Sequence, residues 1–246
     1  MRRLLLPFAL CLTLAGCGGS GPVSVSETSF GRGAEQVWLF RPDSKPKSVV
    51  VFLHGFGGPV EETPENHLPW LRHLAGEMNA VIYPRYERTE HPGDAAAVLV
   101  AVGRALRRLG KPHVPLVVIG YSRGGRLAVE YAAVAPELGQ HPAAVLSVFP
   151  GLLSPAEPEV PLGGLDPRIP LVFMYGTADT AVGGEGVRDL LRRLEAANYP
   201  PDRIRLVAVR SRGTWHANHF APMDTSPRAR HVFWDAADRL IDSVRK

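Results

Sequence analysis

The sequence has no apolar run of the length that a membrane-spanning helix requires. Its N-terminal apolar stretch, residues 4–14, has eleven residues, whereas a spanning helix needs about 20. Aromatic residues make up only 8% of the chain, and cysteine occurs twice, as Cys11 and Cys17. Neither an HExxH string nor a CxxC pair is present, so the common zinc-binding patterns are absent. We therefore expect no membrane-spanning helix, no metal and no other cofactor.

Charge of one sign is also not concentrated anywhere. The 246 residues contain 28 Lys and Arg against 24 Asp and Glu, a net charge of +4. The basic residues are scattered and form no block interleaved with aromatics, so a nucleic-acid partner is not indicated. With 45% apolar residues, the chain can bury one large core, and its length suits one domain or at most two small ones.

The N-terminus has the layout of an export signal. Two arginines precede the apolar stretch, and small residues follow it before Cys17, as in a secretory signal peptide over residues 1–16. The string Leu14-Ala15-Gly16-Cys17 resembles the lipobox of bacterial lipoproteins. That resemblance implies that Cys17 becomes the first mature residue and carries a diacylglyceryl group and a further acyl chain, such as palmitate. The alternative is an ordinary cleaved signal peptide.

A lipidated Cys17 would anchor the chain to the cell envelope, because several acyl chains exceed what stable anchoring needs. Residues 18–29 are Gly- and Ser-rich and are expected to form a flexible tether after Cys17, with the folded domain over residues 30–246. Gly18 stands where an Asp resembles an inner-membrane retention signal in some bacteria, which favours the outer membrane where one exists. No obligate protein partner is evident.

The body of the chain alternates strands and helices. Apolar, β-branched runs predict strands at residues 36–40, 48–53, 80–83, 116–119, 144–149, 171–175 and 204–209. Apolar residues at helical spacing predict helices at residues 94–109, 124–135, 187–194 and 227–244. Asp94 is placed to cap the first of these helices. This order predicts one α/β domain with a mainly parallel sheet covered on both faces.

A serine lies at the tip of one predicted strand-to-helix turn. The string Gly120-Tyr121-Ser122-Arg123-Gly124 follows the strand at 116–119 and opens a helix. Such a GxSxG turn lifts a serine hydroxyl above the edge of the sheet, and the two glycines permit its tight backbone. Ser122 is therefore the candidate nucleophile, with a plain βα turn as the alternative.

A glycine-rich loop follows the strand at 48–53. In His54-Gly55-Phe56-Gly57-Gly58, the backbone can turn an amide toward the space above Ser122. Acyl transfer needs two amide donors for the tetrahedral oxyanion, and we assign them to Phe56 and Arg123. His54 ends a buried strand and is expected to be structural.

A serine nucleophile needs a base, and the base needs an acid that orients it. His216 and His219 both follow the strand at 204–209, and Asp179 follows the strand at 171–175. Open parallel sheets place their sites at these carboxyl ends. Asp224 is a rival acid, but it lies close to the histidines in sequence.

Residues 36–244 resemble the α/β-hydrolase superfamily, in particular bacterial esterase/lipase-like and dienelactone-hydrolase-like members. The matching strings are the HG-aromatic-GG loop, the GYSxGG turn, the G-x-x-D turn and the N-H-F-A-P loop. The resemblance implies that Ser122 is the nucleophile, Asp179 the acid and His219 the base. It also implies oxyanion donors at Phe56 and Arg123. Asn218 stands where Asp is common in this superfamily.

Residues 150–170 contain six prolines and no helical pattern. The segment is too short for a large helical lid, and a long irregular connection is often a binding loop. Its leucines, Leu152, Leu153, Leu162 and Leu165, either line an acyl pocket or hold the loop on the core.

These observations predict an exported, lipid-anchored serine hydrolase that cleaves small-molecule carboxylic esters through an acyl-enzyme. Two alternatives stay open: a hydrolase of amide or peptide bonds with the same residues, and a non-catalytic envelope lipoprotein that uses the fold for binding. The residues alone do not separate an ester from an amide substrate.

Overall fold

The structure, a computed structural model, describes residues 23–56, 63–86, 94–153 and 157–245. The expected signal peptide, Cys17, and Gly57 and Gly58 of the glycine-rich loop lie outside these residues. Within the described ranges, no helix is long and apolar enough to cross a membrane.

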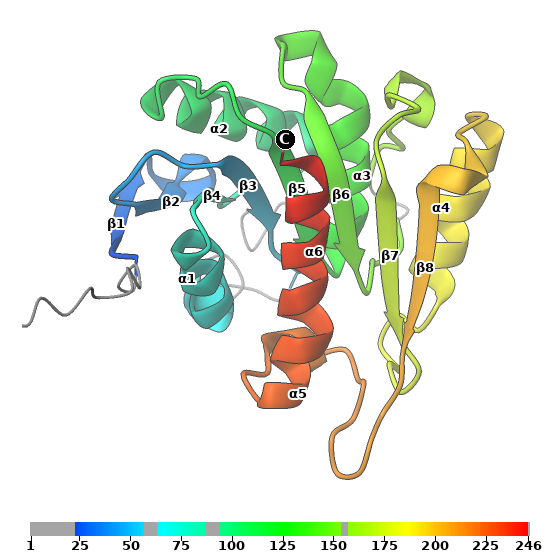
Figure 1. The fold of residues 1–246 in the computed structure, drawn as a ribbon. Coiled ribbons are helices and arrows are strands. Elements are labelled where there is room, and N and C mark those ends of the chain that lie inside the picture. Colours follow the sequence, from blue (N-terminus) through cyan, green and yellow to red (C-terminus); the bar gives the residue numbers. More distant parts are fainter. Residues whose placement is uncertain (1–22, 57–62, 87–93, 154–156, 246) are drawn as a thin grey trace, which may run out of the picture.

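Eight strands of the described residues form one sheet, in the order β1-β2-β4-β3-β5-β6-β7-β8 (Figure 1). They are β1 (Val25–Phe30), β2 (Val37–Pro42), β3 (Ser48–Leu53), β4 (Asn79–Pro84), β5 (Leu116–Tyr121), β6 (Pro142–Val148), β7 (Leu171–Gly176) and β8 (Ile204–Val209). The pairs β1–β2 and β2–β4 are antiparallel, and all others are parallel. The carboxyl ends of β3 and of β5 to β8 therefore meet at one edge of the sheet.

Helices cover both faces of this sheet. On one face lie α1 (Leu68–Gly76) and α6 (Asp235–Val244), and on the other lie α2 (Ala95–Arg108), α3 (Arg123–Val134) and α4 (Glu185–Ala196). Figure 1 shows α6 crossing in front of the sheet and α3 behind it. Each layer of helices buries its apolar face on the sheet, giving two core clusters separated by the strands.

The predicted architecture is confirmed, because every predicted strand and helix has its counterpart. Asp94 caps α2 as expected, since its Oδ1 accepts a hydrogen bond of 2.8 Å from the Ala97 amide. The helix expected at 227–244 consists of α5 (Pro227–Ala229), a π-helical turn (Arg230–Trp234) and α6. The π turn adds a residue to the turn that places Phe233 in the core.

Besides short 3-10 turns, one strand and one α-helix of the described residues were not predicted. The helix α1 buries Trp70, Leu71 and Leu74, and β1 pairs along its whole length with β2. The strand β1 corrects the expectation of a flexible tether up to residue 29, because its residues Val25–Phe30 are ordered in the sheet. Its side chains are mostly exposed and polar. Composition alone therefore does not distinguish this edge strand from a flexible tether.

Candidate active site

Ser122 occupies a strained turn between β5 and α3. Its backbone has φ 55° and ψ −124°, a region that residues with a side chain rarely adopt. The Ser122 amide donates to the Val148 carbonyl at 2.9 Å, and the Ser122 carbonyl accepts from the Gly151 amide at 2.9 Å. These bonds to the neighbouring β6 and to the loop after it fix the conformation that presents the hydroxyl.

Steric crowding requires glycine at positions 120 and 124 of the turn. A Cβ on Gly120 would lie 2.0 Å from the Gly124 carbonyl oxygen, and a Cβ on Gly124 would lie 2.2 Å from the Leu53 carbonyl oxygen. Real Cβ atoms do not approach backbone atoms this closely. The glycines therefore let α3 begin directly against β5 and the end of β3.

The structure brings Ser122, His219 and Asp179 into one chain of hydrogen bonds. His219 Nε2 lies 2.9 Å from Ser122 Oγ, and His219 Nδ1 lies 2.9 Å from Asp179 Oδ2. A carboxylate on one ring nitrogen favours the tautomer with the proton on Nδ1. The Nε2 lone pair is then free to accept the Ser122 hydroxyl proton.

Asp179 is oriented by the backbone that follows it. Its Oδ1 accepts hydrogen bonds from the amides of Ala181 at 2.9 Å and Val182 at 3.1 Å, and its side chain is fully buried. With Oδ1 occupied by these amides, Oδ2 faces His219. This turn holds the carboxylate in the geometry that the imidazole requires.

Tyr121 is a positioning residue that the sequence reasoning missed. Its hydroxyl donates to the His219 carbonyl at 2.8 Å, and the two rings lie 5.2 Å apart. The residue before Ser122 therefore ties the histidine loop to the end of β5. The only sequence signal was the position of a tyrosine inside the GxSxG string.

The alternative candidates for the base and the acid, His216 and Asp224, do not contact Ser122 or His219 in the described hydrogen bonds. The side chain of His216 is exposed, and His219 makes the bonds to Ser122 and Asp179. Asp224 instead accepts hydrogen bonds from Trp215 Nε1 at 2.9 Å and Ser226 Oγ at 2.6 Å. Burial would raise the pKa of Asp224, but these hydrogen bonds outweigh it and lower the pKa below the ordinary value. Asp224 thus stabilises the start of the C-terminal helix.

Of the two residues assigned as oxyanion donors, Arg123 follows Ser122 in the chain and Phe56 follows Gly55. Arg123 is the first residue of α3, and the leading amides of a helix point along its axis, away from its body. A Cβ on Gly55 would lie 3.1 Å from Ser122 Cβ, so the loop that carries Phe56 packs directly on the serine. His54 is buried in the core and stacks on Tyr86 at 4.3 Å, in keeping with the structural role expected for it.

Three exposed apolar residues are next in the chain to residues close to Ser122. Phe56, Leu152 and Phe220 are 60%, 50% and 67% exposed. Each follows a residue that contacts the serine or its backbone: Gly55, Gly151 and His219. Leu162 and Leu165, by contrast, are buried in the core against the α3 side of the sheet. The two deeper leucines therefore hold the loop on the core, whereas Leu153 is partly exposed.

A buried network of charged side chains supports helix α3. Arg126 Nη1 lies 2.7 Å from Glu130 Oε2, and Arg193 Nη2 lies 2.9 Å from Glu130 Oε1. Glu157 accepts from both Arg123 and Arg126. The loop after β6 is thereby joined to α3, and α3 is joined to α4. None of these pairings was predicted from the sequence.

Comparisons with known proteins agree with this architecture. No family model matches the chain. Hormone-sensitive lipase of Ictidomys tridecemlineatus is 29% identical over 152 residues, 58% of this chain and 20% of the lipase. The chain thus spans about a fifth of the length of that curated relative.

Solved structures align over nearly the whole chain. A putative dienelactone hydrolase from Klebsiella pneumoniae subsp. pneumoniae has a TM-score of 0.64 and 19% identity, covering 89% of this chain and 98% of its own. Esterase B from Lactobacillus rhamnosis has a TM-score of 0.65 and 16% identity, covering 92% and 87%. Together with the strand order and the strained turn at Ser122, these similarities show that the chain has the α/β-hydrolase fold.

Proposed function

We propose that this chain is a serine hydrolase that cleaves carboxylic esters through an acyl-enzyme. The observation that carries the proposal is the hydrogen-bonded series Ser122–His219–Asp179, with both donor-acceptor distances at 2.9 Å. The order of these residues along the chain is that of the α/β-hydrolase triad. The similarity to esterases and to hormone-sensitive lipase supports the same class of reaction.

In the proposed first half-reaction, Ser122 Oγ attacks the ester carbonyl carbon while His219 Nε2 takes its proton. Asp179 stays ionised, holds Nδ1–H and stabilises the imidazolium. The amides of Phe56 and Arg123 bind the oxyanion, and each such donor is worth about 2.7–4 kcal/mol in known cases. The C–O bond to the alcohol then breaks, and His219 returns the proton to the departing oxygen.

In the second half-reaction, water replaces the alcohol. His219 takes a proton from the water as its oxygen attacks the acyl carbon, and the same amides bind the second oxyanion. The bond to Ser122 Oγ breaks, and the proton returns to the serine as the carboxylic acid leaves. The exposed side chains of Phe56, Leu152 and Phe220 offer apolar contact to the acyl or alcohol group, which favours apolar esters.

The decisive experiment combines a fluorophosphonate probe with hydrolysis of p-nitrophenyl butyrate. We expect label on Ser122, identified by mass spectrometry, and activity that falls by about four orders of magnitude or more in Ser122→Ala. The matched pair is His219→Ala, which abolishes labelling and hydrolysis, and His216→Ala, which preserves both. A folded wild-type protein with neither label nor activity contradicts the proposal and favours a binding lipoprotein.

The amide alternative is tested with the same acyl group on an anilide. Ester hydrolysis that exceeds anilide hydrolysis by kcat/KM supports the ester assignment. The reverse order assigns the same triad to amide or peptide bonds.

We also propose that Cys17 is lipidated and anchors the protein to the cell envelope. The support is the string Leu14-Ala15-Gly16-Cys17 after a short apolar stretch. Expression of the full chain in a bacterial host is expected to place wild type in the detergent phase of a Triton X-114 partition, with an acylated N-terminal peptide. Cys17→Ala is expected to remain unlipidated, and an unmodified Cys17 in the mature wild type would contradict the anchor.

A further inference from the structure

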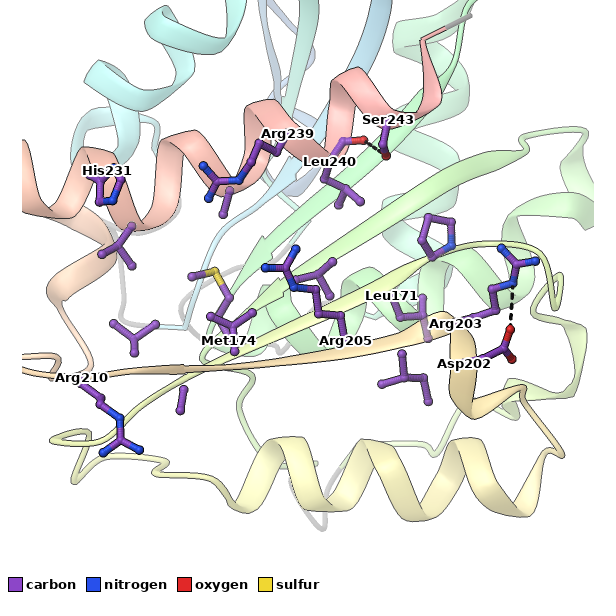
Figure 2. Close-up of a pocket in the computed structure, with 18 of the residues that line it drawn as sticks. Leu171, Met174, Asp202, Arg203, Arg205, Arg210, His231, Arg239, Leu240 and Ser243 are labelled. Atoms are coloured by element: carbon purple, nitrogen blue, oxygen red, sulfur yellow. Dashed lines mark hydrogen bonds and ion pairs between the residues drawn. The ribbon is translucent and has the colours of Figure 1, made fainter.

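A groove of about 590 Å³ runs between the edge strand β8 and helix α6. Figure 2 shows it opening between the two elements, with side chains from both reaching into the space. Ser122, Asp179 and His219 are not among its lining residues, so it is separate from the proposed catalytic centre. Its volume lies within the range of small-molecule sites, about 300–1,000 Å³.

The floor of the groove is apolar. Met174 of β7 and Leu240 of α6 are buried beneath it. Val207 of β8 and Val232 beside α6 pack on the same core cluster but remain partly exposed. Because β8 is the last strand of the sheet, no further described strand covers this floor. A ligand with a hydrocarbon portion would remove this surface from water.

The mouth of the groove is positively charged. Arg205 of β8 and Arg239 of α6 line the groove from its two sides, and Figure 2 shows the Arg205 side chain reaching from β8 toward α6. Arg239 faces Asp235, with Nη1 at 3.9 Å from Oδ2, whereas in the described part of the chain Arg205 has no ion pair. The acidic residue that lines the groove, Asp202, lies beside Arg203 with 3.7 Å between Oδ2 and Nε. Positive charge is therefore in excess along the opening.

We propose that this groove binds an amphiphilic anion, a phosphate or carboxylate head carried on an acyl or alkyl chain. Arginine suits either head, because its planar guanidinium donates two parallel hydrogen bonds to an oxyanion. The head would lie between Arg205 and Arg239, and the chain would lie along Val207, Val232 and Leu240. The head chemistry is shared by free amphiphiles and by lipids in a bilayer, so the test separates these two sources.

The first arm measures binding of dodecyl phosphate below its micelle concentration, with methyl phosphate and inorganic phosphate as references. The mature wild-type protein is compared with Arg205→Gln/Arg239→Gln and with Arg168→Gln/Arg192→Gln. The second pair removes the same charge from exposed positions, 86% and 68% exposed, that do not line the groove. We expect dodecyl phosphate to bind wild type and the exposed-site variant alike, and about tenfold or more weakly to the groove variant. Methyl phosphate is expected to bind far more weakly than dodecyl phosphate.

The second arm measures co-sedimentation with phosphatidylglycerol vesicles, with phosphatidylcholine vesicles as reference. If only the groove variant loses vesicle binding, and dodecyl phosphate binding does not differ among the proteins, the groove binds the anionic lipids of a bilayer. If both double variants bind dodecyl phosphate equally more weakly than wild type, the binding reflects net charge and not the groove. If wild type binds neither dodecyl phosphate nor the vesicles, the groove is not an amphiphile site. Either result overturns the proposal without bearing on catalysis by Ser122.

Discussion

Helices α3 and α4 carry ion pairs of the same chemistry in opposite environments. On α3, the side chains of Arg126 and Glu130 are 2% and 0% exposed, whereas on α4 those of Arg188 and Glu185 are 58% and 60% exposed. The exposed pair keeps its hydration and costs little to form or to lose. The buried pair has lost its water, so each charge depends on its protein partners.

That difference explains why the buried pair is part of a larger network. Glu130 accepts from Arg193 of α4 as well as from Arg126, and Arg126 donates to Glu157 of the loop after β6. Each added partner offsets part of the desolvation cost, and each also joins a different element to α3. The buried ion pair therefore fixes the positions of neighbouring elements, whereas the exposed ion pair does not.

The largest expected effect is that of Glu130→Gln. The change leaves Arg126 and Arg193 buried with less compensating charge, and breaking a buried pair in this way costs about 3–5 kcal/mol. Chemical denaturation followed by circular dichroism measures the loss. The matched control is Glu185→Gln on α4, for which no shift in the midpoint is expected. Equal stability of the two variants would refute the distinction between the helices.

Glu157→Gln is expected to have the next largest effect. Its carboxylate accepts from Arg123 and Arg126, and hydrogen bonds to charged groups contribute about 1.5–3 kcal/mol. Because Glu157 also holds the loop whose Gly151 amide donates to the Ser122 carbonyl, kcat/KM for an ester should fall with stability. Glu159→Gln, at a side chain 64% exposed that lies 3.4 Å from Arg193 Nε, should change both quantities much less.

An intermediate case is the half-buried pair of His73 on α1 and Asp238 on α6, 2.8 Å apart. Burial lowers the pKa of His73, but the hydrogen bond and the charge of Asp238 outweigh it, and the pKa is raised above 6.5. A raised pKa favours the folded state while the imidazole is protonated. This contribution is present below about pH 6.5 and is lost as pH rises through the folded-state pKa.

The pH dependence is measured as the difference in unfolding free energy between wild type and His73→Gln from pH 5.5 to 8.5. The difference should be largest at the acidic end and shrink toward the alkaline end. Asp238→Asn should lose the same dependence. A difference that grows with pH would contradict the assigned sign.

The smallest effect is expected for Arg188→Gln. The hydrogen bond to Arg188 lowers the pKa of Glu185, yet both groups are exposed and screened by water and salt. No measurable change in the denaturation midpoint is expected at physiological ionic strength. A clear loss of stability in this variant would mean that the exposed pair on α4 contributes as the buried pair on α3 does, contrary to the distinction between the two helices.

Much of the fold could be predicted because buried strands have a distinct composition. The strands β3 and β5 are buried at every position, so their sequences are nearly continuous apolar runs. The edge strand β1 has no such pattern, since four of its six residues are exposed. The helix α1 was missed although Trp70, Leu71 and Leu74 mark a buried face.

In the site, too, some features could be predicted from local sequence, and others depend on contacts between distant segments. The turn around Ser122 is marked by its own glycines, of which Gly120 avoids a clash within the turn and Gly124 avoids one with the end of β3. The choice between His216 and His219 depends on the path of one loop, and the residues themselves do not set that path. The bonds of Glu157 to α3 join segments about 30 residues apart, and no local pattern specifies them.

The backbone of Ser122, at φ 55° and ψ −124°, implies a conflict between folding and chemistry at one position. Glycine adopts such a conformation at little cost, whereas a serine there stores conformational energy that the rest of the fold must hold. Replacing Ser122 by glycine would therefore relieve the strain while removing the hydroxyl. Under the proposed function, a lineage that no longer needed the hydroxyl would gain stability by losing it, and selection for reactivity would account for a serine in this conformation.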